Sequence, residues 1–166
     1  MKRIAILVVA LSMLLLAVPL GAHAIHKTNY RANLDGSQEN PPVMTTADGK
    51  ALFKVLDDGN IWFRVTARGL SDSAFGAHIH GPANQGQNAG ILVSLCGGGP
   101  APQVKPSCAK PNGKFDTQGI ITPAHLQGIT MLQLLQWMSN GKVYVNIHTS
   151  NWPGGEIRGA IRAVPS

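Results

Sequence analysis

Hydrophobic and polar residues alternate along several short segments of this chain. Such alternation predicts β-strands, because successive side chains of a strand point to opposite faces of a sheet. In the segment 61–68, Ile61 and Phe63 would face one side, and Trp62 and Arg64 the other. The segments with this pattern are residues 30–34, 50–56, 61–68, 75–80, 90–95, 115–121, 142–149 and 156–164.

Two further signals separate these segments. The sequence Asp-Asp-Gly-Asn at 57–60 lies between two alternating runs and is typical of a hairpin turn. One helix is predicted over about residues 123–139, where Thr122 and the following proline favour a helix start and apolar residues follow helical spacing. Asn140 and the next glycine end it, and Gly128 would weaken or split its first turn.

Composition supports an all-β fold. The chain has 166 residues, of which 19 are glycine and 11 are proline, and this suits a turn-rich β domain better than a helical bundle. About eight short strands with turns at regular spacing predict an antiparallel Greek-key sandwich or barrel. Neither the length nor any linker indicates a second domain, so we expect one domain over residues 25–166.

The first 24 residues have the layout of a secretory signal peptide. A basic start at residues 2–3 precedes an apolar run at 4–20, and Ala22 and Ala24 form a small-residue cleavage pattern. We expect cleavage after Ala24. A membrane anchor is the alternative, although the apolar run is at the lower limit for a span. Cleavage after Ala22 would instead expose His23 as an N-terminal copper chelate.

The chain contains two cysteines, Cys96 and Cys108. In an oxidising compartment, two cysteines at this spacing favour a disulfide. Two thiolate ligands for a metal ion are the alternative, but no further cysteine or histidine lies near them. We therefore predict a disulfide and a secreted or periplasmic location.

Charge argues against nucleic acid as a partner. The chain carries 14 Lys and Arg against 8 Asp and Glu, a net charge of +6, which falls to +4 when Lys2 and Arg3 are removed with the signal peptide. The basic residues are scattered, without a run or a helical stripe. We expect an extracellular protein or a small ligand as partner, and no stable membrane span after cleavage.

Three histidines are the best candidates for chemistry. His78 and His80 stand two apart on a predicted strand and share a face, with Cα atoms about 6.5–7 Å apart. His148 ends another predicted strand, on the face opposite its core residues. If the strands are neighbours, these residues and Arg158 meet in one surface site that suits copper or zinc. In the alternative, the histidines bond to loops and lock the sheet.

A supporting network is predicted around this site. Glu39, in a proline-stiffened loop, is a candidate partner for Arg158, and Asn146 and Glu156 also lie on non-core faces. His125, on the predicted helix, reads as a surface histidine. The chain has no nucleophile elbow, phosphate-binding loop or paired-carboxylate motif, so a non-catalytic role is favoured and no organic cofactor site is expected.

Four motifs, taken in order, resemble the CHRD domain, which is named for its repeats in chordin and also occurs singly in exported microbial proteins. The resemblance covers about residues 29–163 and implies an all-β domain without an agreed biochemical activity. The motifs are QENPP at 38–42, AHIHG at 77–81, YVNIHT at 144–149 and PGGEIRG at 153–159.

A weaker resemblance is to copper-zinc superoxide dismutase. His78 and His80 match its first histidine pair, His148 matches its late copper ligand, and Arg158 matches the arginine that guides the anion in a redox reaction. Residues 81–95 contain no histidine, so the bridging ligand and the zinc cluster of that family are missing. The resemblance implies a three-histidine copper site on a superoxide-dismutase-like fold rather than full dismutase chemistry.

Three functions remain open from the sequence. The first is an exported CHRD-domain binding module without catalysis. The second is a copper-binding protein, with or without redox activity, that uses His78, His80 and His148. The third is a structural domain of the cell envelope or matrix.

Overall fold

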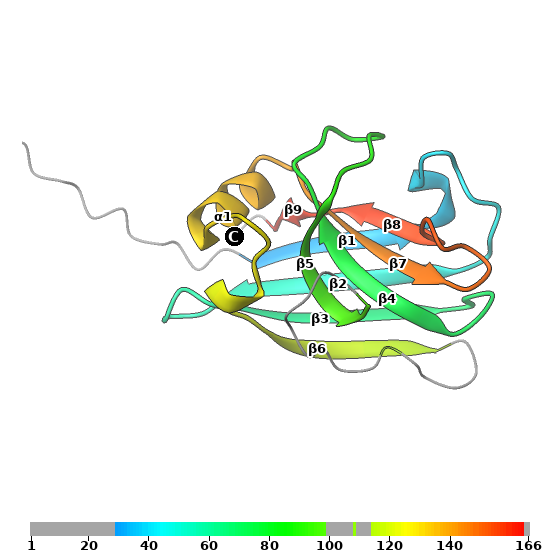
Figure 1. The fold of residues 1–166 in the computed structure, drawn as a ribbon, viewed down its shortest axis with the longest axis horizontal. Coiled ribbons are helices and arrows are strands. Elements are labelled where there is room, and N and C mark those ends of the chain that lie inside the picture. Colours follow the sequence, from blue (N-terminus) through cyan, green and yellow to red (C-terminus); the bar gives the residue numbers. More distant parts are fainter. Residues whose placement is uncertain (1–28, 99–107, 109–113, 165–166) are drawn as a thin grey trace, which may run out of the picture.

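A computed structural model describes residues 29–98, 108 and 114–164 of the chain. In these residues the polypeptide forms nine strands, one α-helix and two short 3₁₀ helices (Figure 1). The strands are β1 (Asn29–Asp35), β2 (Asp48–Val55), β3 (Ile61–Arg68), β4 (Ala74–His80), β5 (Ile91–Gly97), β6 (Phe115–Ile121), β7 (Tyr144–Thr149), β8 (Ile157–Ala160) and β9 (Arg162–Ala163). The helices are η1 (Gly36–Gln38), η2 (Pro123–His125) and α1 (Met131–Ser139).

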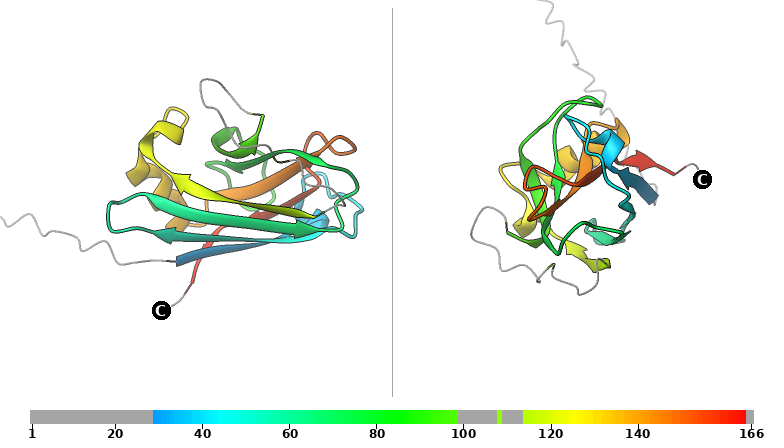
Figure 2. Two further views of the ribbon diagram at one scale, coloured as in Figure 1. Left: turned by 90° about the horizontal axis from the view of Figure 1, so that it is seen from below. Right: turned by 90° about the vertical axis from the view of Figure 1, so that its right-hand side faces the viewer.

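The strands form one antiparallel sheet in the order β5-β4-β7-β8-β1-β2-β3-β6, and β9 pairs with β1. The sheet curls until it is nearly closed, as the end-on view in Figure 2 shows. The predicted all-β sandwich or barrel is therefore confirmed. The turn at 57–60 joins β2 to β3 as expected, and Gly59 there has a φ of 81°, a conformation that glycine adopts at little cost.

The curled sheet encloses a single hydrophobic core. Its inward side chains include Phe53, Val65, Ile79 and Val145, all at most 2% exposed. Helix α1 closes one end of the barrel (Figure 1), where its buried Leu134 and Met138 join the core.

Two of the predicted elements are divided in the structure. The expected helix over 123–139 is split into η2 and α1, and α1 takes Thr130, not Thr122, as its N-cap. Gly128, between them, has a φ of 67°, which no helix residue adopts, so the break falls where glycine permits it. The expected last strand divides into β8 and β9.

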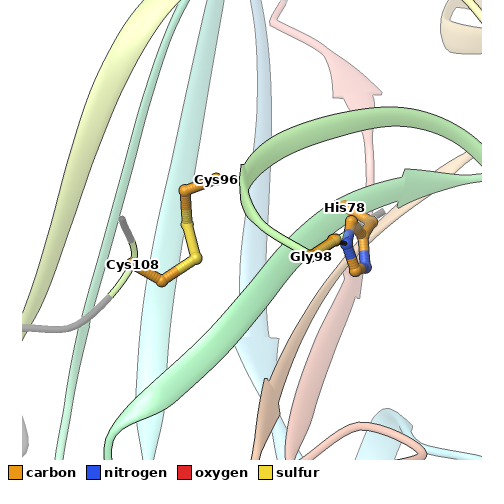
Figure 3. Close-up of a disulfide and its surroundings, with 4 residues drawn as sticks. All are labelled: His78, Cys96, Gly98 and Cys108. Atoms are coloured by element: carbon orange, nitrogen blue, oxygen red, sulfur yellow. Dashed lines mark hydrogen bonds between the residues drawn. A yellow bond between two sulfur atoms is a disulfide. The ribbon is translucent and has the colours of Figure 1, made fainter. Parts of the chain in front are cut away.

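The predicted disulfide between Cys96 and Cys108 is present, with Cα atoms 5.2 Å apart (Figure 3). It ties the end of β5 to residue 108. The predicted signal peptide lies outside the described residues. Among the residues that are described, the helices fall short of the length and apolar character that a transmembrane helix requires.

Candidate metal centre

The sheet order places the three candidate histidines on adjacent strands. His78 and His80 lie on β4, and His148 lies on the neighbouring β7. In the register of this pair, His148 is opposite Gly76 and Asn146 is opposite His78. The next strand, β8, places Arg158 opposite Asn146. The alternation of each strand turns these side chains away from the core, as the sequence predicted.

The three imidazoles form a close cluster. Their ring centroids are 4.9 Å apart for His78 and His148, 5.6 Å for His78 and His80, and 5.7 Å for His80 and His148. Each ring offers one nitrogen, and the three nitrogen atoms lie within 4.8 Å of one another. Metal–nitrogen bonds of about 2 Å bring such ligands slightly closer still. The residues therefore fit a single ion after small rotations of the rings.

Backbone carbonyls of the surrounding loops fix the orientation of each ring. His80 Nδ1 bonds to the carbonyl of Ala89 at 2.9 Å, and His148 Nδ1 bonds to that of Pro153 at 3.0 Å. His78 Nε2 bonds to the carbonyl of Gly98, as Figure 3 shows. A carbonyl only accepts, so these nitrogens carry the proton and the opposite nitrogen of each ring keeps its lone pair. Metal-binding histidines are held in this way, and the loop bonds predicted by the structural alternative are also present.

The electrostatics of the cluster keep two of its rings neutral. Burial lowers the pKa of His80 to about 4, with smaller contributions from the charges of His78 and Arg158 and against the opposing effect of the hydrogen bond to Ala89. Burial, followed by His78, likewise lowers the pKa of His148 to about 4. Their Nε2 atoms are buried and have no hydrogen-bond partner among the described residues. At neutral pH these two rings therefore present unprotonated nitrogens inside the protein.

The expectation of a surface site is wrong in one respect. His78, His80 and His148 are only 4%, 7% and 7% exposed. Segments outside the strands contact all three rings, through Ala89 of the β4–β5 loop, Pro153 of the β7–β8 loop and Gly98 directly after β5. Strand alternation identifies the face on which a side chain lies, but not whether a loop folds over that face.

Arg158 and Glu39 form the predicted ion pair beside the cluster. Arg158 Nε lies 3.9 Å from Glu39 Oε2, and both side chains are almost fully buried. The same guanidinium donates to the carbonyl of Gln38 and, at 2.8 Å, to Asn88 Oδ1. Burial raises the pKa of Glu39 to about 7, although Arg158 and the amide of Asn146 oppose the shift.

Glu156 belongs to a different network. Its carboxylate accepts hydrogen bonds from the hydroxyls of Thr45, Ser71 and Thr149 and from the backbone N–H of Ser71, at 2.7–2.9 Å. It is fully buried and ties the β1–β2 and β3–β4 loops to the end of β7. Its predicted place in the histidine network is therefore wrong, and its contacts are structural. His125 is half-buried and bonds to Thr122, outside the cluster.

Sequence reasoning did not assign Tyr144, Gly76 or Gly155 a role in the candidate site. The Tyr144 ring stacks on His80 with centroids 5.2 Å apart, and the Arg158 guanidinium lies 4.9 Å from the centre of the same ring. A Cβ at Gly76 would come within 2.9 Å of the His78 ring, and one at Gly155 within 2.4 Å of the Asn146 amide. The signal for Tyr144 and Gly76 was in the pattern, because both alternate with the histidines on their strands.

Comparison with known protein families identifies the domain. The family model for the CHRD domain matches residues 30–161, most of the chain and all of the candidate centre. No curated protein and no solved structure gave a significant match. Since the matched region contains the whole sheet core and its histidine-bearing strands, the chain belongs to the CHRD domain family.

Proposed function

We propose that this CHRD protein is an exported metal-binding module, in which His78, His80 and His148 hold one copper ion. The observation that carries the proposal is the convergence of three buried ring nitrogens within 4.8 Å. Three fixed, neutral imidazoles are a donor set that copper and zinc favour. Among divalent first-row metals, copper binds most tightly to a given set of such ligands.

The burial of the three histidines favours metal binding over a purely structural hydrogen-bond network. A network that only locked the loops would satisfy the Nε2 atoms of His80 and His148, since an unsatisfied buried polar atom is costly. A metal ion accepts the lone pairs of these atoms and removes that cost. Export is supported by the disulfide and by membership in a family named for an extracellular protein.

The residues of the proposed site have two roles, metal coordination and orientation of the rings. His78, His80 and His148 supply the ligand atoms, and the carbonyls of Gly98, Ala89 and Pro153 hold the rings in place. A bound copper ion would supply a Lewis acid or a one-electron couple in this enclosed space. The described residues contain no second cluster of metal-ligating side chains. Metal binding is the function that we propose for this cluster.

Copper affinity and stoichiometry test the proposal. The purified protein is titrated with Cu(II) in competition with a chromophoric chelator, alongside His80→Ala and the matched control His125→Ala. We expect one copper per chain with sub-micromolar affinity, a loss of roughly 100-fold or more in His80→Ala, and no change in the control. Weak binding that is indifferent to His80→Ala would contradict the proposal, and tight binding of Zn(II) alone would contradict the choice of copper.

A further inference from the structure

A second site lies beside the metal centre, on the other side of Tyr144. An open cavity of about 440 Å³ is lined by the β1–β2 loop, the β4–β5 loop and the adjacent parts of β7 and β8. We call it the amide-lined cavity, because its wall includes the amide side chains of Gln38, Asn40, Asn84, Gln85 and Gln87. Its volume is that of a site for a small molecule.

Among the described residues that line this cavity, Arg158 is the only cationic one and Glu39 the only acidic one. The Arg158 guanidinium is held from both walls, by the carbonyl of Gln38 on one side and by Asn88 Oδ1 on the other. Its Nη2 has no hydrogen-bond partner in the described part of the chain, although the side chain is only 3% exposed. An unsatisfied buried guanidinium nitrogen is costly, and an anion satisfies it best.

Glu39 does not supply the missing acceptor for Arg158 Nη2. Its Oε1 also lacks a hydrogen-bond partner among the described residues, and its nearest contact with Arg158 is a 3.9 Å approach to Nε rather than a paired, bidentate bond. The pair with Glu39 therefore leaves Nη2 without a hydrogen-bond acceptor. The N–H groups of Nε and Nη1 already donate to Gln38, Gln87 and Asn88, so those of Nη2 are the ones left for a ligand. A charged carboxylate oxygen is a stronger acceptor for them than a neutral one.

The rest of the wall indicates what else the ligand carries. The amides of Asn40, Gln85 and Gln87 are exposed and keep free donor or acceptor capacity, which suits hydroxyl groups. Pro42, Ala83 and Val143 supply apolar surface between them. A ring or chain that bears several hydroxyls and one carboxylate would use all three kinds of surface.

From these features we infer that the amide-lined cavity binds a hydroxylated organic acid of monosaccharide size, with its carboxylate on Arg158. The site is separate from the metal centre, because β7, which carries Tyr144, lies between β4 with His80 and β8 with Arg158. The inference does not rest on the proposed copper site. It makes the protein a receptor for a sugar acid, whether or not a metal is bound.

The test uses the purified protein treated with EDTA, so that no metal ion can take up the anion. Sodium D-glucuronate, D-glucose and sodium acetate are titrated separately, with isotope-edited NMR to locate the binding site. Glucuronate should bind saturably and shift the resonances of residues 38–42 and 83–87. Glucose, which lacks the carboxylate, and acetate, which lacks the hydroxyls, should each bind at least about tenfold more weakly.

Two variants identify the site. Ala160→Leu places a larger side chain at the cavity wall without removing a polar group, and it should weaken glucuronate binding by about tenfold or more. Arg158→Gln should abolish the preference for glucuronate over glucose, and Arg64→Gln, on an exposed arginine of β3, is the matched control and should change nothing. If Arg158→Gln fails to fold, Ala160→Leu alone decides. Equal binding of glucuronate and glucose, no saturable binding, or unchanged binding in Ala160→Leu would overturn the inference.

Discussion

The outer face of the sheet is exposed to solvent along β2 and buried along β7. Along β2 buried and exposed residues alternate strictly, and its outward residues lie in solvent. Along β7 all six residues are buried, although the same alternation sends Tyr144, Asn146 and His148 outward. The difference comes from the loops that fold over β4, β7 and β8. It shows that a polar residue on the outer face becomes a candidate for chemistry only where a loop takes it out of water.

The ion pairs of the two parts show the same contrast. Arg64 and Asp116 pair at 2.8 Å across β3 and β6 with about half of each side chain exposed. Arg158 and Glu39 are farther apart but are 3% and 5% exposed. Water screens the first pair, so its strength matters little. The second pair lies in a low dielectric, where burial raises the pKa of Glu39 although Arg158 and Asn146 oppose the shift.

The largest expected effect is at the carboxylate that anchors the covering loops. Glu156→Ala removes the acceptor of four hydrogen bonds and leaves the backbone N–H of Ser71 without it. We expect the free energy of unfolding to fall by about 4 kcal/mol. Urea denaturation of Glu156→Ala and of wild type measures the change. A loss below about 1 kcal/mol would show that the loops are held by other contacts.

The disulfide should come next. The double variant Cys96→Ser with Cys108→Ser opens a cross-link across a sequence separation of 12, and the unfolding free energy should fall by about 3 kcal/mol. Gly98 follows the disulfide closely and accepts the bond from His78, so copper affinity should fall by about tenfold as well. Reductant should have no effect on the double variant. Unchanged copper affinity would separate the disulfide from the metal centre.

The pH dependence of the stability of the metal-free protein tests the pKa values of the buried groups His80, His148 and Glu39. Unfolded histidine takes up a proton near pH 6.5, whereas His80 and His148 do so only near pH 4 when folded, so their contribution to stability is lost as the pH falls from 6.5 to 4. Glu39 has the opposite sign, because the folded carboxyl keeps its proton to about pH 7 and the unfolded one loses it near 4.5. Its contribution is lost as the pH rises.

Between pH 5 and 6.5 the two histidines therefore outweigh one carboxyl. The stability of wild type should rise with pH by at most about 1.4 kcal/mol per unit, the slope for one proton. Glu39→Gln removes the opposing group and should make the rise about twice as steep. Urea denaturation at several pH values gives the slope. A flat profile in both proteins would contradict the pKa values assigned to His80 and His148.

The smallest effect on stability is expected at the exposed outer face of β3 and β6. Asp116→Asn breaks the exposed pair with Arg64, and its stability should equal that of wild type within the error of denaturation. Copper binding should not change either. A marked loss of stability would mean that the Arg64–Asp116 pair is shielded from water, by a partner or a second copy of the chain. The outer face of β3 and β6 would then be buried like that of β7.

Much of the fold could be predicted from the sequence, because strand alternation and turn residues are local signals. The pattern in β3 and the turn at 57–60 identified a hairpin directly. The break of the predicted helix lies at Gly128, the residue that was expected to weaken or split it, but the start of α1 was placed too early in the sequence, at Thr122. Thr130 and Gln133 form the capping box that marks the true start of α1.

The proximity of the three histidines was predicted, but the role of Glu156, the contacts of Tyr144 and the burial of the cluster were not. The shared face of His78 and His80 follows from the period of a strand, and the pairing of Glu39 with Arg158 was named in advance. Burial depends on loops whose conformation no local pattern specifies. For the same reason, the separate network of Glu156 could not be predicted, because its partners Thr45 and Ser71 are distant in sequence.

The most direct test of the account is a crystal structure of the copper-loaded protein with diffraction data at the copper absorption edge. We predict one anomalous peak per chain, about 2 Å from Nε2 of His80, from Nε2 of His148 and from a ring nitrogen of His78. The hydrogen bonds of Ala89 and Pro153 to the two Nδ1 atoms should persist. A peak at another site, or none among the three buried histidines, would contradict the account.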